Sequence, residues 1–319
     1  MPRGQSSLAA AAATGTDGIV TTANLHAAGI SRRLAERAVA TQRWQRAARG
    51  IYVPHPPPLT NLDLVRAARA YVDGPMVVTG VVVLRELGLR WLPSIDSVHL
   101  RVPDSTRRTS SAAVRVTRTS GFDELTTWVR YGERMADPAQ AVADAARHAD
   151  GLRTARGIVL GAVADRWAGS EELRRRVDRG RRNGSALLHR AVSDAERGCA
   201  SPPEAELVDA LVGRGVPFLV NPEVSVAGRS LGFVDVWLLG TAVGGEVESV
   251  ERHEGGGREE STYDRHERFR VDGLDLVHLS VRRIRADADE AVTHLLRQAA
   301  AGPQVPSGLV VRPRGPVLR

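Results

Sequence analysis

The proline-rich run at residues 53–58, VPHPPP, limits the fold of this chain more than any other feature. Each proline fixes its own φ angle and lacks a backbone N–H, so the run can continue neither a helix nor the interior of a sheet. Runs of this kind act as semi-rigid spacers. The sequence therefore predicts a domain boundary here, which leaves a small N-terminal domain at residues 1–58.

Two helices joined by a tight turn are expected before this boundary. Thr22 is the predicted cap of the first helix, and Gly29 ends it. Ser31 caps the second helix, which has an apolar stripe on one side and Arg33 and Arg37 one turn apart on the other. This layout is typical of a helix-turn-helix, whose second helix lies in the major groove of DNA.

A two-stranded wing is predicted after the second helix. Residues 44–46 and 51–53 have the composition of strands, and Arg49-Gly50 forms the tight connection between them. The alternative is a small helical domain that binds protein or only braces the rest of the chain, because winged helices serve both purposes. The candidate DNA contacts of the winged helix-turn-helix are Ser31, Arg32, Arg33, Arg37, Arg46 and Arg49.

The N-terminal stretch also resembles a known family. The segments Gly18-Ile-Val-Thr, Gly29-Ile30-Ser31, Arg43-Trp44 and Arg49-Gly50-Ile51-Tyr52-Val53 are similar to the N-terminal domain of AbiEi-family antitoxins, which are DNA-binding regulators of type IV toxin-antitoxin systems. The resemblance implies double-stranded DNA, an operator and a cognate toxin as partners. Residues 59–198 are similar to the region that follows the winged helix in AbiEi-like proteins, and we expect a mixed α+β scaffold there.

The acids of residues 232–253, GFVDVWLLGTAVGGEVESVERH, indicate a second functional region. Asp235 lies in a short apolar run, and a turn around Gly240 leads to a second run that ends in Glu246-Val247-Glu248. Alternate residues of a strand share a face, so a hairpin here would bring Asp235 beside Glu246 and Glu248. Crowded carboxylates favour a hard, oxygen-loving cation such as Mg²⁺. A solvated acidic face is the alternative.

This pattern, followed by Asp264-Arg265-His266 and by residues 273–278 (GLDLVH), resembles the small restriction-endonuclease-like domains related to very-short-patch repair endonucleases. The resemblance covers about the last third of the chain and begins at Ser201-Pro202-Pro203-Glu204. It implies that Asp235 and Glu246 bind Mg²⁺ or Mn²⁺ if the site is active. Glu248 would be a third active-site position, and Glu204 an acid supplied by the preceding helix.

The chain departs from this family at one position. Many nucleases of the superfamily have a lysine two residues after the second acid, whereas this chain has Glu248 there and contains no lysine. Glu204 also has a purely structural explanation, because Ser201-Pro202-Pro203-Glu204 is a capping box at a helix start. The catalytic group that replaces the lysine is to be sought in His253, with Arg252, Arg265 and His266 as further choices.

The expected fold class is thus α/β and multidomain. The winged helix-turn-helix at residues 1–58 precedes the α+β region at residues 59–198 and a restriction-endonuclease-like mixed sheet flanked by helices at residues 199–300. The tail at residues 301–319 is rich in proline, glycine and arginine, and we expect it to be disordered.

Composition supports a polyanionic partner. The chain has 44 basic residues, all arginine, against 37 acidic ones, for a net charge of +7. The single cysteine, Cys199, excludes an internal disulfide, so the cytoplasm is the expected compartment. No apolar run approaches the roughly 20 residues needed to cross a membrane.

Three functions remain open at this point. The first is an AbiEi-like transcriptional regulator, whose last domain provides dimerisation or a further DNA contact. The second is a metal-dependent DNA endonuclease that the winged helix recruits to its substrate. In the third, the protein is a partner-binding antitoxin whose nuclease-like domain has lost activity. A basic surface and a winged helix serve all three functions, so we expect a DNA-binding protein, with AbiEi-like regulation as the leading role and metal-dependent cleavage as the second.

Overall fold

A computed structural model describes residues 3–90, 92–179, 184–248 and 265–319. These residues form a mixed α/β structure with two compact units. The N-terminal unit is Met1–Asp150 with Arg175–Gly184, and the C-terminal unit is Gly151–Arg174 with Ser185–Arg319. The boundaries expected after residues 58 and 198 do not coincide with this division. No helix in the described ranges combines the length and the apolar character needed to cross a membrane.

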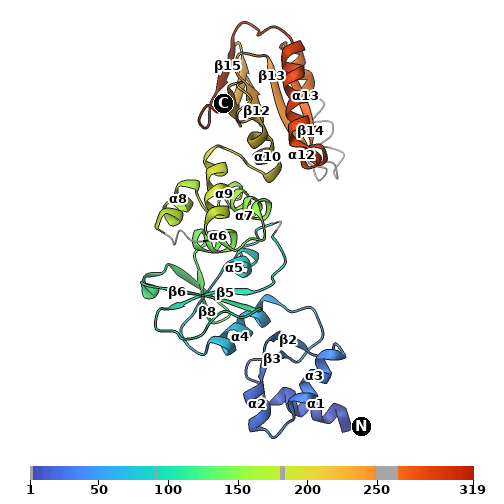
Figure 1. Cartoon of the computed structure of the whole chain (residues 1–319), viewed down its shortest axis with the longest axis vertical. Helices are drawn as coiled ribbons and strands as arrows, with labels where there is room; N and C mark the ends of the chain where they lie inside the picture. The colour runs from blue at the N-terminus through green and yellow to red at the C-terminus, as the bar shows by residue number, and fades with distance from the viewer. Residues whose placement is uncertain (1–2, 91, 180–183, 249–264) are drawn as a thin grey trace. The chain divides into compact units, whose positions relative to one another are not determined.

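In residues 3–53 a first helix and a short strand precede the expected order of two helices and a hairpin (Figure 1). They are α1 (Arg3–Ala13), β1 (Val20–Thr21), α2 (Thr22–Ala27), α3 (Arg32–Ala40), β2 (Gln45–Ala48) and β3 (Ile51–Val53). Thr21, one residue earlier than predicted, caps α2, and its Oγ1 accepts a hydrogen bond from the Asn24 N–H at 3.1 Å. Ser31 caps α3 as predicted.

The β2–β3 hairpin is tied to the start of α2. Strands β2 and β3 pair antiparallel, and β1 pairs with the other edge of β3. Gly50 forms the turn with a φ of +74°, and a Cβ atom there would lie 2.7 Å from Thr22 Oγ1. The Gly50 carbonyl accepts a hydrogen bond from the Thr22 N–H at 2.8 Å. Only glycine combines this backbone angle with so close an approach.

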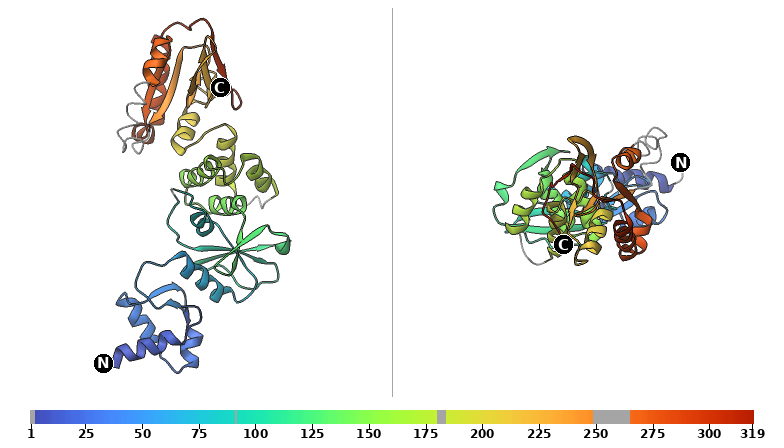
Figure 2. Two further views of the ribbon diagram at one scale, coloured as in Figure 1. Left: turned by 180° about the vertical axis from the view of Figure 1, so that it is seen from behind. Right: turned by 90° about the horizontal axis from the view of Figure 1, so that it is seen from above.

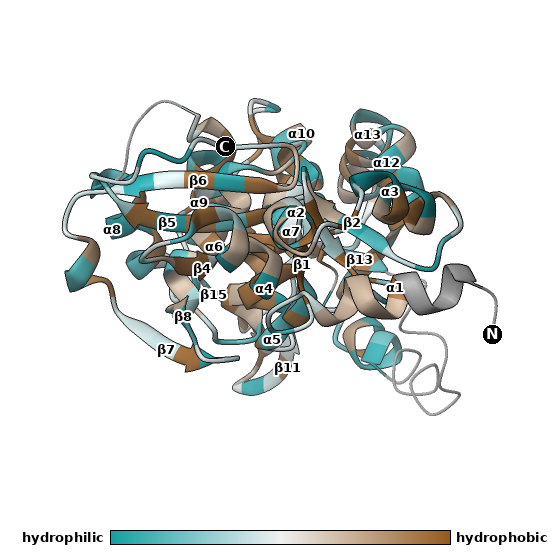
Figure 3. Cartoon of the chain, turned by 90° about the horizontal axis from the view of Figure 1, so that it is seen from below, coloured by the Kyte–Doolittle hydropathy of each residue, from teal (hydrophilic) through white to brown (hydrophobic). Residues whose placement is uncertain are grey.

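A five-stranded sheet with the order β6-β5-β4-β8-β7 forms the rest of the N-terminal unit. The strands and helices of residues 61–147 are α4 (Asn61–Val72), β4 (Val77–Thr79), α5 (Val81–Glu86), β5 (Val98–Pro103), β6 (Val114–Thr119), η1 (Phe122–Glu124), β7 (Thr127–Arg130), β8 (Glu133–Ala136) and α6 (Pro138–Arg147). Hydrophobic and polar residues alternate along β6, as the colours of Figure 3 show. Such alternation is the pattern of a strand with one face toward solvent.

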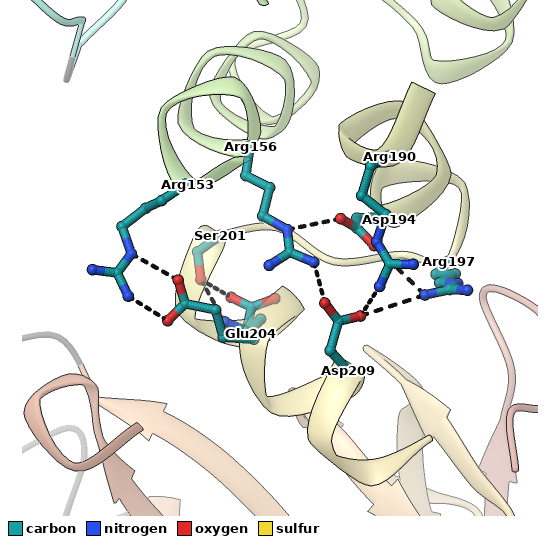
Figure 4. A network of polar contacts seen from close by, with 9 residues as sticks. Arg153, Arg156, Arg190, Asp194, Arg197, Ser201, Glu204 and Asp209 are labelled. Atoms are coloured by element: carbon teal, nitrogen blue, oxygen red, sulfur yellow. Dashed lines mark hydrogen bonds and ion pairs between the residues drawn. The ribbon is translucent and has the colours of Figure 1, made fainter. Parts of the chain in front are cut away.

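Three helices of the C-terminal unit are joined by a buried ion network (Figure 4). They are α7 (Leu152–Ala164), α9 (Ala186–Glu196) and α10 (Pro202–Leu211). A further helix, α8 (Ser170–Arg179), lies between α7 and α9 in the sequence and contributes residues to both units. Arg156 of α7 has a side chain only 3% exposed, and its Nε lies 2.8 Å from Asp194 Oδ2 of α9. Arg156 also pairs with Asp209 of α10. A buried charge is tolerated only when it is paired, so these helices must stay together.

Two sheets complete the C-terminal unit (Figures 1 and 2). The first has the order β14-β13-β12-β9 and the second the order β11-β10-β15. Their elements, with the last two helices, are β9 (Phe218–Val220), β10 (Glu223–Val226), β11 (Arg229–Phe233), β12 (Val236–Leu238), β13 (Val243–Glu248), β14 (Asp275–Ser280), α12 (Val281–Ala286), α13 (Ala288–Ala301) and β15 (Leu309–Arg312).

The four-stranded sheet has a core on each face. On one face, Phe218 and Leu238 pack with α10, α12 and α13. On the other, Trp237 packs with Val224 of the three-stranded sheet and with Phe269 of a helix at residues 265–271. This mixed sheet flanked by helices agrees with the coarse fold expected for residues 199–300.

The prediction of a disordered tail at residues 301–319 is wrong. The tail contributes β15, which pairs antiparallel with β10 from Glu223 opposite Arg312 to Val226 opposite Leu309. Leu318 then forms an antiparallel bridge with Phe218. Leu309 and Val311 of β15 pack on the core that contains Trp237, and that burial outweighs the local proline and glycine content.

Candidate functional site

The arginines predicted to contact DNA have different environments in the N-terminal unit. Arg33 and Arg37 are exposed on α3, and Arg49 is exposed at the β2–β3 turn. Within the described ranges, none of these three side chains forms a hydrogen bond or an ion pair. Their guanidinium groups are therefore available to a phosphate backbone.

Arg32 and Arg46 are held by one acid, Glu36. Arg32 Nε lies 3.1 Å from Glu36 Oε1, and Arg46 pairs with Glu36 Oε2. The Tyr52 hydroxyl donates to Glu36 Oε1 at 2.7 Å. Glu36 thus connects α3 to both strands of the hairpin. Ser31, the remaining candidate, accepts a hydrogen bond from the Arg33 N–H at 3.3 Å as the helix cap.

In the C-terminal unit, the predicted acidic hairpin is present as β12 and β13. The strands pair antiparallel, with Val236 opposite Gly245 and Trp237 opposite Gly244. Asp235 directly precedes β12, and its Oδ2 accepts a hydrogen bond from the Val247 N–H at 2.7 Å. The Asp235 carboxylate therefore lies beside the strand that carries Glu246 and Glu248.

Glu204 lies in the first turn of α10 and also lies near Asp235. Ser201 caps α10 as predicted and accepts a hydrogen bond from the Glu204 N–H at 3.4 Å. The Glu204 carboxylate accepts from the Ala200 N–H at 2.8 Å and the Ser201 hydroxyl at 2.9 Å, so the return bond of the predicted capping box comes from Ala200, one residue before the cap. The Glu204 side chain is buried, and Asn221 Nδ2 lies 3.2 Å from its Oε2. Burial and the negative charge of Asp235 raise the pKa of Glu204 to about 7. Glu204 can therefore exchange a proton near neutral pH.

Glu246 and Glu248 face cationic or imidazole side chains. Arg265 pairs with Glu246 at 2.6 Å between Nη2 and Oε1, and His266 Nε2 lies 3.5 Å from Glu246 Oε2. Glu248 Oε1 pairs with His278 Nδ1. These partners lower the repulsion that three neighbouring carboxylates would otherwise create.

Two histidines complete the site, and one of them was not singled out from the sequence. His278 Nε2 lies 2.8 Å from His266 Nδ1, and the ring centroids are 3.6 Å apart. Burial and the neighbouring His278 lower the pKa of His266. The signal for His278 was its place in an apolar strand, where a lone histidine needs a polar partner.

The described residues fit a metal ion, but with ligands that differ from the predicted pair. Glu246, His266 and His278 each offer a ligand atom, and these atoms lie within 4.8 Å of one another. Asp235 is not a member of this group. His253 and Arg252 lie outside the residues that the structure describes. Asp235, Glu246 and Glu248 thus lie along the β12–β13 pair. The three ligand atoms that lie close together come instead from one carboxylate, Glu246, and two imidazoles.

Comparison with known proteins adds little to this geometry. No protein-family model matches the chain, and no curated protein matches it. Among solved structures, the chain is similar to the RV2827C protein from Mycobacterium tuberculosis, with 14% sequence identity and a TM-score of 0.38. The match covers 65% of this chain and 80% of that one. A likeness this low does not establish a shared fold.

Proposed function

We propose that this chain is a double-stranded-DNA-binding protein that reads DNA through a winged helix-turn-helix at residues 1–58. The observation that carries the proposal is the pair of exposed arginines on α3, Arg33 and Arg37, one helical turn apart and without side-chain partners in the described ranges. The exposed Arg49 at the turn of the β2–β3 hairpin adds a third cation. A helix and an adjoining hairpin with free cations match the docking of a winged helix on DNA.

The role that we favour is regulation of transcription in the manner of AbiEi-family antitoxins. The N-terminal sequence pattern supports this role, and so does the order of two helices followed by a hairpin. In such a role the DNA is an operator and a cognate toxin is a further partner. The C-terminal unit would then serve dimerisation, a second DNA contact or binding of the toxin.

DNA binding by α3 is tested by measuring the affinity for a DNA duplex after removal of two of its arginine charges. Arg33→Ala with Arg37→Ala should weaken binding at least about tenfold at moderate salt, because two phosphate contacts are lost. The matched control is Arg285→Ala with Arg297→Ala, which removes the same charge from exposed positions of the C-terminal unit. Equal losses in the two double variants would place the DNA surface elsewhere.

A second candidate function, metal-dependent cleavage of DNA, is favoured by the acids around β13. Asp235 reaches the backbone of β13 through its hydrogen bond to Val247, and Glu204 lies close enough to Asp235 for its pKa to rise. In nucleases of this kind a bound divalent ion activates water and neutralises charge on the scissile phosphate. The part of this chain would be to hold that ion with acids and to exchange a proton at Glu204.

Cleavage is tested with supercoiled plasmid in Mg²⁺, Mn²⁺ or chelator. If this activity exists, Asp235→Ala should abolish ion-dependent cutting and leave duplex affinity within about twofold, because Asp235 belongs to the other unit. Glu267→Ala, which removes an exposed acid near the site, is the control and should cut normally. Cutting that persists in Asp235→Ala would rule out these acids.

A further inference from the structure

Three side chains of the C-terminal unit, Glu246, His266 and His278, form what we call the histidine–glutamate cluster. One ligand atom from each lies within 4.8 Å of the others. All three residues are partly buried, which limits competition from water. Oxygen and nitrogen donors gathered so closely have the composition of a transition-metal site.

The backbone assembles the cluster from segments that are distant in sequence. Glu246 of β13 and His278 of β14 are partners in a parallel pair, so their side chains leave the same face of the sheet. The helix at residues 265–271 brings His266 against His278. Nε2 of His278 and Nδ1 of His266 are 2.8 Å apart.

A carboxylate orients His278. Glu248 pairs with Nδ1 of this ring, and the other nitrogen, Nε2, faces His266. A proton held on Nδ1 by the carboxylate leaves the lone pair on Nε2. Metal-binding histidines are commonly oriented by a carboxylate in this way. The acid two residues after Glu246 thus has a role that differs from that of the lysine found in many nucleases.

An arginine orients Glu246 in the same manner. Arg265 Nη2 lies 2.6 Å from Oε1 of Glu246, and Arg265 also donates to the Phe233 carbonyl. The second carboxylate oxygen, Oε2, is turned toward His266. Each donor of the cluster is therefore either fixed by a neighbouring group or packed against another donor.

We propose that the histidine–glutamate cluster binds a transition-metal ion of the Zn²⁺ class, with Glu246, His266 and His278 as ligands and Glu248 positioning His278. Two imidazoles favour such an ion over Mg²⁺, which prefers oxygen ligands. Three protein ligands leave a fourth coordination position open. The site differs from the Asp235–Glu246 pair implied by the nuclease resemblance, and it does not depend on DNA binding.

Binding would change the arrangement of the two rings. Their planes are now inclined by 31°, with centroids 3.6 Å apart. An ion bound by both histidines lies in the plane of each ring, so the rings must turn apart to share it. An ion bound at both nitrogens would replace the hydrogen bond between His266 Nδ1 and His278 Nε2, and the His266 proton would move to Nε2 of the same ring.

The test is titration of the chelator-treated full-length chain with Zn²⁺ by calorimetry and with Co²⁺ by visible absorption. We expect one saturable ion per chain, a Co²⁺ spectrum typical of low-coordinate nitrogen and oxygen ligation, and no displacement by excess Mg²⁺. Absence of saturable binding would overturn the proposal. A Co²⁺ spectrum typical of octahedral ligation by oxygen alone would also overturn the proposal. Both outcomes are measured on the unaltered chain.

Variants then identify the ligands. His278→Ala and Glu246→Gln should remove Zn²⁺ binding, and Glu248→Gln should weaken it about 10–100-fold, as loss of an orienting carboxylate does elsewhere. His294→Gln, on α13 outside the cluster, is the control and should bind normally. Asp235→Asn should also bind normally. A contradicting result would be loss of Zn²⁺ binding in Asp235→Asn while a folded His278→Ala or His266→Gln protein still binds. The ion would then be held by Asp235 and its neighbouring acids and not by the histidines.

Discussion

At the scale of single residues, burial decides which ionisable groups of this chain are charged. His99 of β5 packs its ring edge on His148, with 5.1 Å between the centroids. Burial, with smaller contributions from the nearby charges of His148 and Arg115, lowers the pKa of His99 to about 4. The folded chain therefore keeps this histidine neutral at pH values where an unfolded chain protonates it.

The pH dependence of stability follows from this shift. Between pH 4 and pH 6.5 the unfolded state binds more protons at His99 than the folded state, so the free energy of unfolding should increase as the pH rises. The lowered pKa of His99 should change the free energy of unfolding by about 3 kcal/mol in all between these pH values. Denaturant unfolding at several pH values measures this increase in the free energy of unfolding. The increase should be smaller in His99→Gln and unchanged in His294→Gln. Equal slopes in the two variants would contradict this explanation.

Residue roles were predictable from the sequence where they depend on near neighbours. The caps at Ser31 and Ser201 were visible because a cap and the N–H groups it binds are a few residues apart. The approach of Arg46 to Glu36 was not predicted. That contact depends on how the hairpin packs on α3, which no local pattern contains.

At the scale of elements, the C-terminal strand β15 is a structural part of the C-terminal unit. Leu309 and Val311 point toward the core shared by the two sheets, whereas Val310, between them, is 45% exposed. The sequence did not predict β15, because LVVR is short and lies among prolines and glycines. Its pairing partner β10 is more than 80 positions earlier in the chain, as the pairing of Val226 with Leu309 shows.

Substitutions in β15 test this assignment. Leu309→Ala and Val311→Ala should each lower the free energy of unfolding by about 1–2 kcal/mol, because each removes partly buried apolar surface. Val310→Ala on the outer face should change it by less than about 0.5 kcal/mol. Thermal unfolding of the three variants decides the matter. Three equally small effects would agree with a disordered tail and not with a strand.

At the scale of the whole molecule, the two candidate functions reside in different units. All six candidate DNA contacts belong to the N-terminal unit, and the acids and histidines belong to the C-terminal one. The acidic hairpin was predictable because its two strands are adjacent in sequence. The division into units was not predicted, and neither was the pairing inside the C-terminal unit of the buried Arg156 with Asp194 and Asp209, which lie about 40 and 50 residues further along the chain.

The most direct test of DNA binding is the salt dependence of duplex affinity. Each phosphate contact contributes about 0.9 to the slope of log affinity against log salt. Measured by fluorescence anisotropy from about 50 to about 200 mM salt, the slope should be smaller by about two in the Arg33→Ala, Arg37→Ala protein than in the unaltered chain. The Arg285→Ala, Arg297→Ala protein should keep the original slope. An unchanged slope in the first variant would contradict a DNA-binding surface on α3.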